Sequence, residues 1–251
     1  MSDKRNQIKE YFEAPKPSFP TKALLIGIVV LIIGIAIGEA VTIIIGLLLG
    51  AGIIIFPILS YNKAKQRFEA RPSDRQMDAW LIEDFQHIID KDALDKLGLD
   101  KDELIKDSLV IPGPVFWSVN GINTDEVVRR LGNDNYFRYS VWNVEVFLFT
   151  QNYLANYGCT YNWLRNTSVN EHTNEFFYKD VVSVKTATES SAYTLKDGKR
   201  MEHSQTFQLN LSGDQVTVVT NDENLKTSSE MISQVDKAVQ SIRTMLREKK
   251  A

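Results

Sequence analysis

The chain has 251 residues, of which 43% are hydrophobic and 24% are charged, and its formal net charge is -3. This length leaves room for a membrane element and one domain of ordinary size. The acidic balance argues against nucleic acid as the main partner, because nucleic-acid binders present strongly basic surfaces. The single cysteine, Cys159, excludes internal disulfides and is compatible with a reducing compartment.

Residues 1–22 are predicted to form a cytoplasmic N-terminal tail of mixed charge with several prolines. The apolar block that follows starts later than the apolar region of a secretory signal. It also runs far beyond the roughly 7 to 15 residues of such a region. We therefore expect the block to remain in the mature protein.

The block 23–61 is almost continuously apolar and contains one charged residue, Glu39. As a single straight helix it would be roughly 58 Å long, nearly twice the roughly 30 Å of bilayer hydrocarbon. A break at Gly38-Glu39-Ala40 gives helices 23–38 and 40–61 instead, of about 24 and 32 Å. The sequence thus predicts a two-helix transmembrane hairpin with Glu39 hydrated at its tip. The alternative, an intramembrane proton or ion ligand, lacks a second charge in the block.

Glycines recur along the predicted helices and predict close backbone packing between them: Gly27, Gly34, Gly38, Gly46 and Gly50. Gly46 and Gly50 form a GxxxG pair, a spacing typical of helix contacts in lipid. The competing interpretation is that glycine is simply common in membrane helices.

Basic residues flank the apolar block on both sides and are missing from its tip: Lys4, Arg5, Lys9, Lys16 and Lys22 before it, and Lys63, Lys65, Arg67, Arg71 and Arg75 after it. This distribution predicts a multi-pass protein of the inner (plasma) membrane with cytoplasmic N- and C-termini. The bilayer is then a partner, and the second basic cluster could also contact anionic lipid headgroups.

Residues 62–108 are predicted to form an amphipathic helical linker. Ser73 and Gln76 make a capping box after Pro72, and apolar residues recur on one face until Gly98. Asp100 and Glu103 begin a further short turn. The acidic stretch 90–103 lacks the residue order of a calcium loop, so a solvated helix end is preferred.

Residues 109–251 are predicted to form a soluble antiparallel sheet domain with a C-terminal helix. The stretch 109–117 contains two prolines and cannot continue a helix, and 122–132 predicts another short helix. Period-two segments rich in β-branched and aromatic residues then predict strands at 136–150, 152–163, 175–188, around Ala192, and at 200–211 and 215–220. A capping box at Thr227 and Glu230 starts the final amphipathic helix.

This order, together with the strand FFYKDVVSVKT (176–186) and the terminal helix, resembles the pleckstrin-homology-like (PH-like) domains that bacteria attach to membrane helices. The resemblance covers roughly 109–250 and implies an α+β fold in which a sheet or barrel is capped by a helix. In eukaryotic members, basic surfaces bind phosphoinositides. Lys179, Lys185, Lys199 and Arg200 are the candidate basic surface here, although interleaved acidic residues favour ordinary solvated strand faces.

No nucleotide-binding or serine-hydrolase motif occurs, and the three histidines are too far apart in sequence to support a metal site. Cys159 lies in a predicted strand and is interpreted as a small buried hydrophobe. We therefore expect no cofactor, no metal and no enzymatic activity.

The sequence predicts an adaptor or scaffold whose hairpin tethers the PH-like domain near the membrane. There it would bind a protein partner, a second copy of itself or lipid headgroups. The alternative is a component of an oligomeric transport or channel complex assembled through the glycine-rich hairpin.

Overall fold

The structure is a computed structural model of the whole chain, and it describes residues 2–189, 193–194, 200–201, 204–211, 215–222 and 229–250. The chain forms two compact units. One comprises 9–72 and is called the helical unit. The other comprises 1–8 together with 73–251 and is called the sheet unit. The segment expected to be a linker is therefore divided between the two, with its larger part in the sheet unit.

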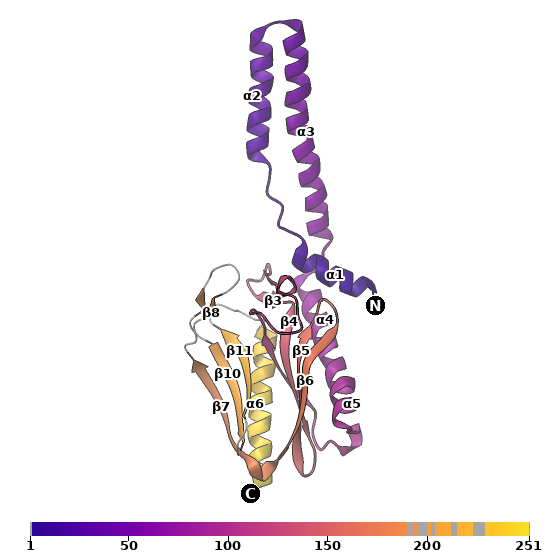
Figure 1. Cartoon of the computed structure of the whole chain (residues 1–251), viewed down its shortest axis with the longest axis vertical. Helices are drawn as coiled ribbons and strands as arrows, with labels where there is room; N and C mark the ends of the chain where they lie inside the picture. Colours follow the sequence, from indigo (N-terminus) through magenta and orange to yellow (C-terminus); the bar gives the residue numbers. More distant parts are fainter. Residues whose placement is uncertain are drawn as a thin grey trace. The chain divides into compact units, whose positions relative to one another are not determined.

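The helical unit consists mainly of α2 (Thr21–Ile37) and α3 (Ala40–Ala70), which run antiparallel and side by side (Figure 1). The chain reverses at Gly38, whose positive φ of 78° ends α2. The third helix continues nine residues beyond the predicted end because NKAKQRFEA contains good helix formers. It ends at Arg71, which precedes a proline and has an extended conformation.

By length and composition, α3 is the one helix among the described residues that could cross a membrane. The sequence predicted two spans, but α2 has only 17 residues and falls below the length of a full span, although it is apolar throughout. At about 26 Å, α2 is close to the length predicted for the first span, and it is this length, set by the turn at Gly38, that keeps the helix short of the roughly 30 Å of bilayer hydrocarbon.

In the sheet unit, α4 (Asp74–His87) begins at the predicted cap, where Ser73 Oγ accepts a hydrogen bond from the Gln76 amide at 3.2 Å. A π-helical turn, η1 (Ile88–Ala93), and a short helix, α5 (Leu94–Leu97), follow and end at Gly98. The N-terminal helix α1 (Ser2–Glu13) contributes its first residues to this unit.

Four antiparallel strands form the larger sheet in the order β1-β4-β5-β6: β1 (Leu109–Pro114), β4 (Val141–Phe149), β5 (Tyr153–Asn162) and β6 (Thr167–Phe177). On one face, Phe85 of α4 packs edge-on against Trp142 and Tyr161, with ring centroids 5.8 and 6.4 Å away. The other face borders the main core. Burial on both faces explains the nearly unbroken burial along β4 and β5.

The smaller sheet has the order β11-β10-β7: β7 (Val181–Glu189), β10 (Ser204–Leu211) and β11 (Gln215–Asp222). Helix α6 (Ser229–Lys250) lies beside it (Figure 1). A single core joins both sheets and this helix, with Phe147 from the larger sheet, Phe207 from the smaller and Ile242 from α6 all buried. The α+β architecture with antiparallel sheets is thus confirmed.

Two predicted elements change in the tertiary structure. Within the stretch 109–117, residues 109–114 form β1, which tolerates prolines because it lies at the edge of its sheet. The stretch 122–132 yields only a 3-10 turn, η3 (Thr124–Glu126), and then β2 (Arg129–Leu131), which pairs with β3 (Phe137–Tyr139).

The predicted strand 175–188 is split by the 3-10 turn η4 (Tyr178–Asp180), in which the buried Tyr178 hydroxyl donates to the carbonyl of Thr150 at 2.8 Å. β8 (Tyr193–Thr194) pairs with β9 (Arg200–Met201). The predicted cap at Thr227 lies outside the described residues.

A buried guanidinium fastens α4 to β3. Arg138 is 3% exposed and donates two hydrogen bonds to Asp78, at 2.9 and 2.6 Å. It donates two more to Asp134, at 2.7 and 2.6 Å. These hydrogen bonds hold the pKa of Asp134 below its ordinary value.

Candidate functional site

Four of the five glycines predicted to pack lie where α2 and α3 touch. A Cβ atom added to Gly34 would lie 2.7 Å from the Cα of Gly46, whereas ordinary contacts begin at 3.4 Å. One added to Gly27 would lie 3.1 Å from the carbonyl oxygen of Gly50. At the contact of Gly34 with Gly46, no side chain fits without separating the helices. Gly38 does not share this role, since it occupies the turn with nothing within 4 Å.

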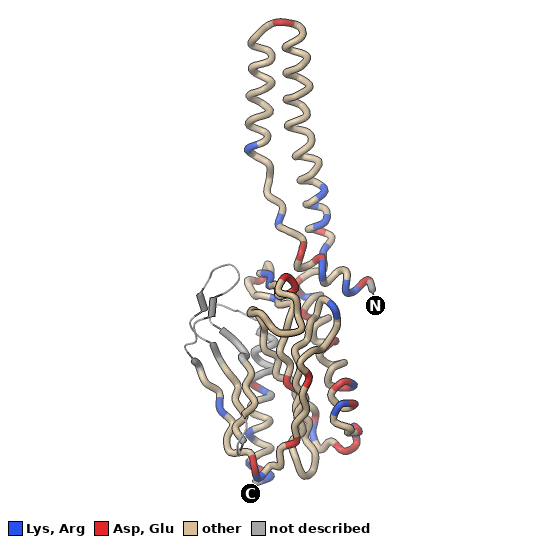
Figure 2. Tube along the Cα trace, viewed as in Figure 1, with Lys and Arg blue, Asp and Glu red and all other residues tan. Residues whose placement is uncertain are grey.

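Glu39 lies at the turn between the two apolar helices and precedes the first residue of α3. Its backbone oxygen accepts hydrogen bonds from the amide of Ile43 at 3.0 Å and the hydroxyl of Thr42 at 2.7 Å. Figure 2 shows acidic colour at this turn and basic colour toward the other end of the helices, with none between.

The N-terminal segment is bound to α4 by two carboxylates, Glu83, which lies 2.8 Å from Lys4, and the more buried Asp84. Asp84 is 8% exposed and accepts hydrogen bonds from Arg5 at 2.7 Å, Lys4 at 3.0 Å and the indole of Trp163 at 2.8 Å. Arg5 also donates to the side chain of Asn166. Burial raises the pKa of Asp84, but the hydrogen bonds from Arg5 and Lys4 outweigh it, so the pKa lies below its ordinary value. We call this arrangement the Asp84 clamp.

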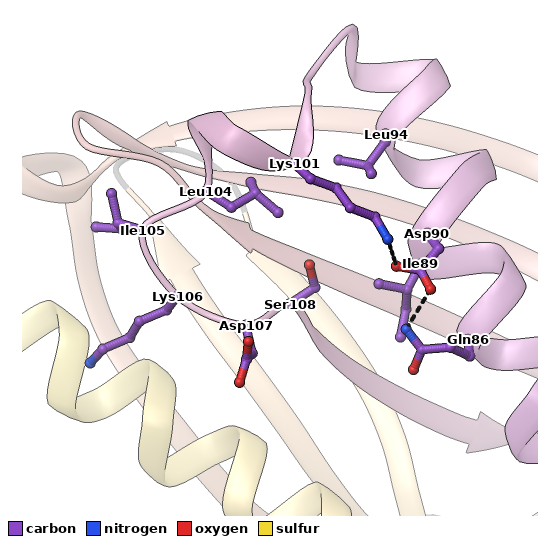
Figure 3. A pocket seen from close by; sticks show the side chains of 10 residues that line it. All are labelled: Gln86, Ile89, Asp90, Leu94, Lys101, Leu104, Ile105, Lys106, Asp107 and Ser108. Carbon is purple, nitrogen blue, oxygen red and sulfur yellow. Dashed lines mark hydrogen bonds and ion pairs between the residues drawn. The ribbon is translucent and has the colours of Figure 1, made fainter.

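The π-helical turn after α4 separates two pockets of the sheet unit. The first has a volume of about 510 Å³ and is drawn in Figure 3. Apolar side chains from η1, α5 and the segment before β1 line it: Ile89, Leu94, Leu104 and Ile105. Lys101 pairs with Asp90 at 2.7 Å on its rim, which lowers the pKa of that carboxyl.

On the other side of this pocket, the Lys106 side chain points toward a helix (Figure 3), and its ammonium lies 3.3 Å from the carboxylate of Glu248 in α6. Polar and charged side chains make up the rest of the lining, so the pocket is a mixed recess with an apolar patch, which suits an amphipathic side chain of a protein partner.

The second pocket, of about 380 Å³, is mostly polar and acidic. Glu171 accepts hydrogen bonds from Tyr157 at 2.7 Å and Lys96 at 2.9 Å, and these lower its pKa. Burial raises the pKa of Asp92. His87 also lines this pocket, but no group of three metal-ligating side chains occurs within the described part of the chain.

Strands β4, β5 and β6 bring together a polar cluster that sequence reasoning missed. Glu145 accepts a hydrogen bond from Asn156 at 2.8 Å, and His172 lies 3.5 Å from the same carboxylate. The residue between them is Gly158, where a Cβ would lie 2.2 Å from the imidazole and 2.6 Å from the carboxylate. Sequence shows no signal for it, because the residues are joined only by strand register.

The described residues of the predicted basic surface lie in different elements of the sheet unit. Lys179 lies in η4 with its ammonium 5.8 Å from the ring centroid of Phe177, and Lys185 lies farther along in β7. Arg200 begins β9, and Lys199 lies outside the described residues. Cys159 is buried, which raises the pKa of its thiol to about 11. His203 lies outside the described residues.

These features define an α+β protein that carries a unit of antiparallel sheets and, among the residues that the structure describes, one helix long and apolar enough to cross a membrane. No protein-family model, curated protein or solved structure matches the chain.

Proposed function

We propose that this protein is a membrane adaptor in which α2 and α3 form a two-span hairpin and the sheet unit is a PH-like binding domain on the cytoplasmic side. The observation that carries the proposal is the Asp84 clamp. It places residues 4 and 5 in the same compact unit as residues 73–251.

A chain that leaves one compact unit at residue 8 and returns to it at residue 73 must cross a membrane an even number of times. A single crossing by α3 would put Arg5 and Asp84 on opposite sides of the bilayer and break their hydrogen bond. Two crossings keep the clamp intact and place Glu39 on the far side.

The surface of the helical unit supports burial in lipid. Large apolar side chains are about half exposed or more along both helices, among them Leu48 at 71% and Phe56 at 74%. Water-soluble proteins rarely expose contiguous apolar patches larger than a few hundred Å². The 22 residues from Ala40 to Tyr61 correspond to about 33 Å, which matches the hydrocarbon thickness of about 30 Å. The shorter α2 can be completed by Phe19 and Pro20 at the interface.

A binding role for the sheet unit is supported by its strand order and by the first pocket. A four-strand antiparallel sheet, a three-strand sheet and a C-terminal helix follow in the order of the PH-like resemblance. The pocket beside η1 offers a recess of mixed apolar and polar lining for a partner side chain, and π-helical turns occur frequently at functional sites. Tethering raises the effective concentration of the domain, so that modest contacts suffice. The function is therefore binding rather than catalysis.

The alternative role in an oligomeric channel assembled through glycines has less support. Gly27, Gly34, Gly46 and Gly50 pack α2 against α3 of the same chain. These positions are then unavailable to a second copy while the two helices stay paired.

Cysteine accessibility in sealed inner-membrane vesicles of known orientation tests the topology. Single cysteines at Asp3, Glu39 and Glu223 are introduced on a Cys159→Ser background and exposed to a membrane-impermeant maleimide. The proposal requires the first and third to be labelled from the same side and the second from the opposite side. Labelling of positions 3 and 223 from opposite sides would refute the hairpin.

A further inference from the structure

The helical unit presents a basic surface just outside the apolar part of its helices. The boundary is marked by Phe19 and Tyr61, whose rings stack edge to face with centroids 5.3 Å apart. Aromatic side chains favour the membrane-water interface because they combine an apolar body with a polarisable or polar edge. This pair therefore places the hydrocarbon boundary at the ends of α2 and α3 that lie away from the turn.

Beyond Tyr61, α3 continues to Ala70. At about 1.5 Å per residue, Lys63 lies about 3 Å and Arg67 about 9 Å past this boundary. The headgroup layer on each side of a bilayer is about 5 to 8 Å thick. Both cations therefore reach the depth of lipid phosphates, since long basic side chains extend toward the interface. Lys22, in the first turn of α2, lies at the same boundary.

The spacing of these cations favours binding of an anion, because it would offset the repulsion between their like charges. Lys63, Arg67 and Arg71 occur at i, i+4 and i+8, so successive members face one another along the same side of the chain. Like charges at this spacing destabilise a helix. Within the described part of the chain, neither Lys63 nor Arg67 forms an ion pair, whereas their neighbour Lys65 lies 3.7 Å from Glu69.

Arg71 also has a cationic group that is not fully paired. Its guanidinium carbon lies 3.8 Å from the ring centroid of Phe68 and 5.4 Å from that of Tyr11. Among the residues that the structure describes, its buried Nη1 atom has no hydrogen-bond partner. Two aromatic rings thus hold the guanidinium in place while leaving a donor unsatisfied.

We infer that Lys63 and Arg67, with Lys22 from the facing helix, bind the phosphate groups of anionic glycerophospholipids in the cytoplasmic leaflet. This inference rests on the proposed hairpin and adds a preferred lipid to it. Each cation near an anionic membrane surface strengthens binding by about fivefold at low salt. Removal of both α3 cations is therefore expected to weaken the preference for anionic lipid by about 25-fold at low salt.

The test uses the full chain reconstituted in nanodiscs that contain equal amounts of phosphatidylglycerol and phosphatidylcholine. Lipids that remain bound after transfer to detergent are counted by native mass spectrometry. The wild-type chain is expected to retain phosphatidylglycerol over phosphatidylcholine, and the K63Q/R67Q variant is expected to lose this preference. The matched control is K179Q/K185Q, which removes two cations from the sheet unit and is expected to retain it.

Equal retention of the two lipids by the wild-type chain would overturn the inference, as would an unchanged preference in K63Q/R67Q or an equal loss in the control. These outcomes leave the membrane anchor itself unaffected, because incorporation into the nanodisc is measured separately. Failure of the wild-type chain to incorporate would count against the proposed function rather than against the lipid preference alone.

Discussion

The closest backbone contact in the helical unit can be tested by placing a leucine on it. Gly34 and Gly46 face each other across α2 and α3, and a Cβ at Gly34 would fall 0.7 Å short of the 3.4 Å at which ordinary contact begins. A leucine adds three further carbon atoms beyond this Cβ. The helices must therefore separate in G34L, toward the 8 to 10 Å interaxial distances typical of helices with large side chains between them, at a cost of about 1 to 3 kcal/mol.

Gly52 provides the matched control. It lies in the middle of α3, and a Cβ built on it would meet nothing within 4 Å. Both G34L and G52L replace a helical glycine by leucine in an apolar segment, so the gain in helix propensity of up to about 1 kcal/mol is common to both. The difference between the variants then reports packing alone.

Distances between spin labels at K22C and L59C on a Cys159→Ser background measure the separation of the two helices in reconstituted full-length protein. We expect G34L to lengthen or broaden the distance distribution by about 2 Å or more, and G52L to superimpose on the parent. Identical distributions for both variants would refute the glycine-mediated contact. A changed distance distribution in G52L but not in G34L would show that α2 contacts the face of α3 that carries Gly52 instead.

Three further predictions concern the sheet unit. Arg138→Met leaves Asp78 and Asp134 without their cation and is expected to lower the free energy of unfolding by about 3 kcal/mol in denaturant titrations. R165Q removes a more exposed ion pair and should lower it by about 0.5 kcal/mol or less. Equal effects of the two variants would contradict a stabilising role for the buried Arg138 ion pairs. The pKa of Asp84 is depressed in the folded chain, so its stabilisation is complete above an unfolded pKa of about 3.9 and is lost as the pH falls through the lower folded pKa. Trp163 fluorescence should change in that acid range and D84N should abolish the step, and a step that persists in D84N would assign it to another carboxyl. With its pKa raised to about 11, buried Cys159 should resist maleimide at about pH 8 until the chain is denatured, and rapid labelling of the native protein would show that the thiol is accessible.

Local sequence signals predicted the elements whose start, end or type depends on residues within the element itself. The break at Glu39 follows from a charge and a glycine within an apolar run, and the cap at Ser73 follows from a hydroxyl three residues before a free amide. The terminal helix α6 follows from its apolar period of 3.6. These signals depend on neighbours within one or two turns, which the sequence lists directly.

Strand β6 shows why other elements escaped prediction. Most residues of Thr167–Phe177 are polar and exposed, so their pattern gives no apolar alternation, yet β5 supplies the hydrogen-bond ladder that makes them a strand. β1 was missed for the related reason that Pro112 and Pro114 are acceptable only at the edge position that the sheet gives them.

The sequence by itself therefore determined where the apolar helices lie, where the chain reverses between them and which end of the chain forms an amphipathic helix. Each of these properties depends on residues that are close together in the sequence. Only the tertiary structure decided that Lys4 and Arg5 meet Asp84, and that Glu145 meets His172 above Gly158. Such contacts depend on strand register and on the order of layers. Those are set by the summed packing of the whole unit rather than by any short pattern.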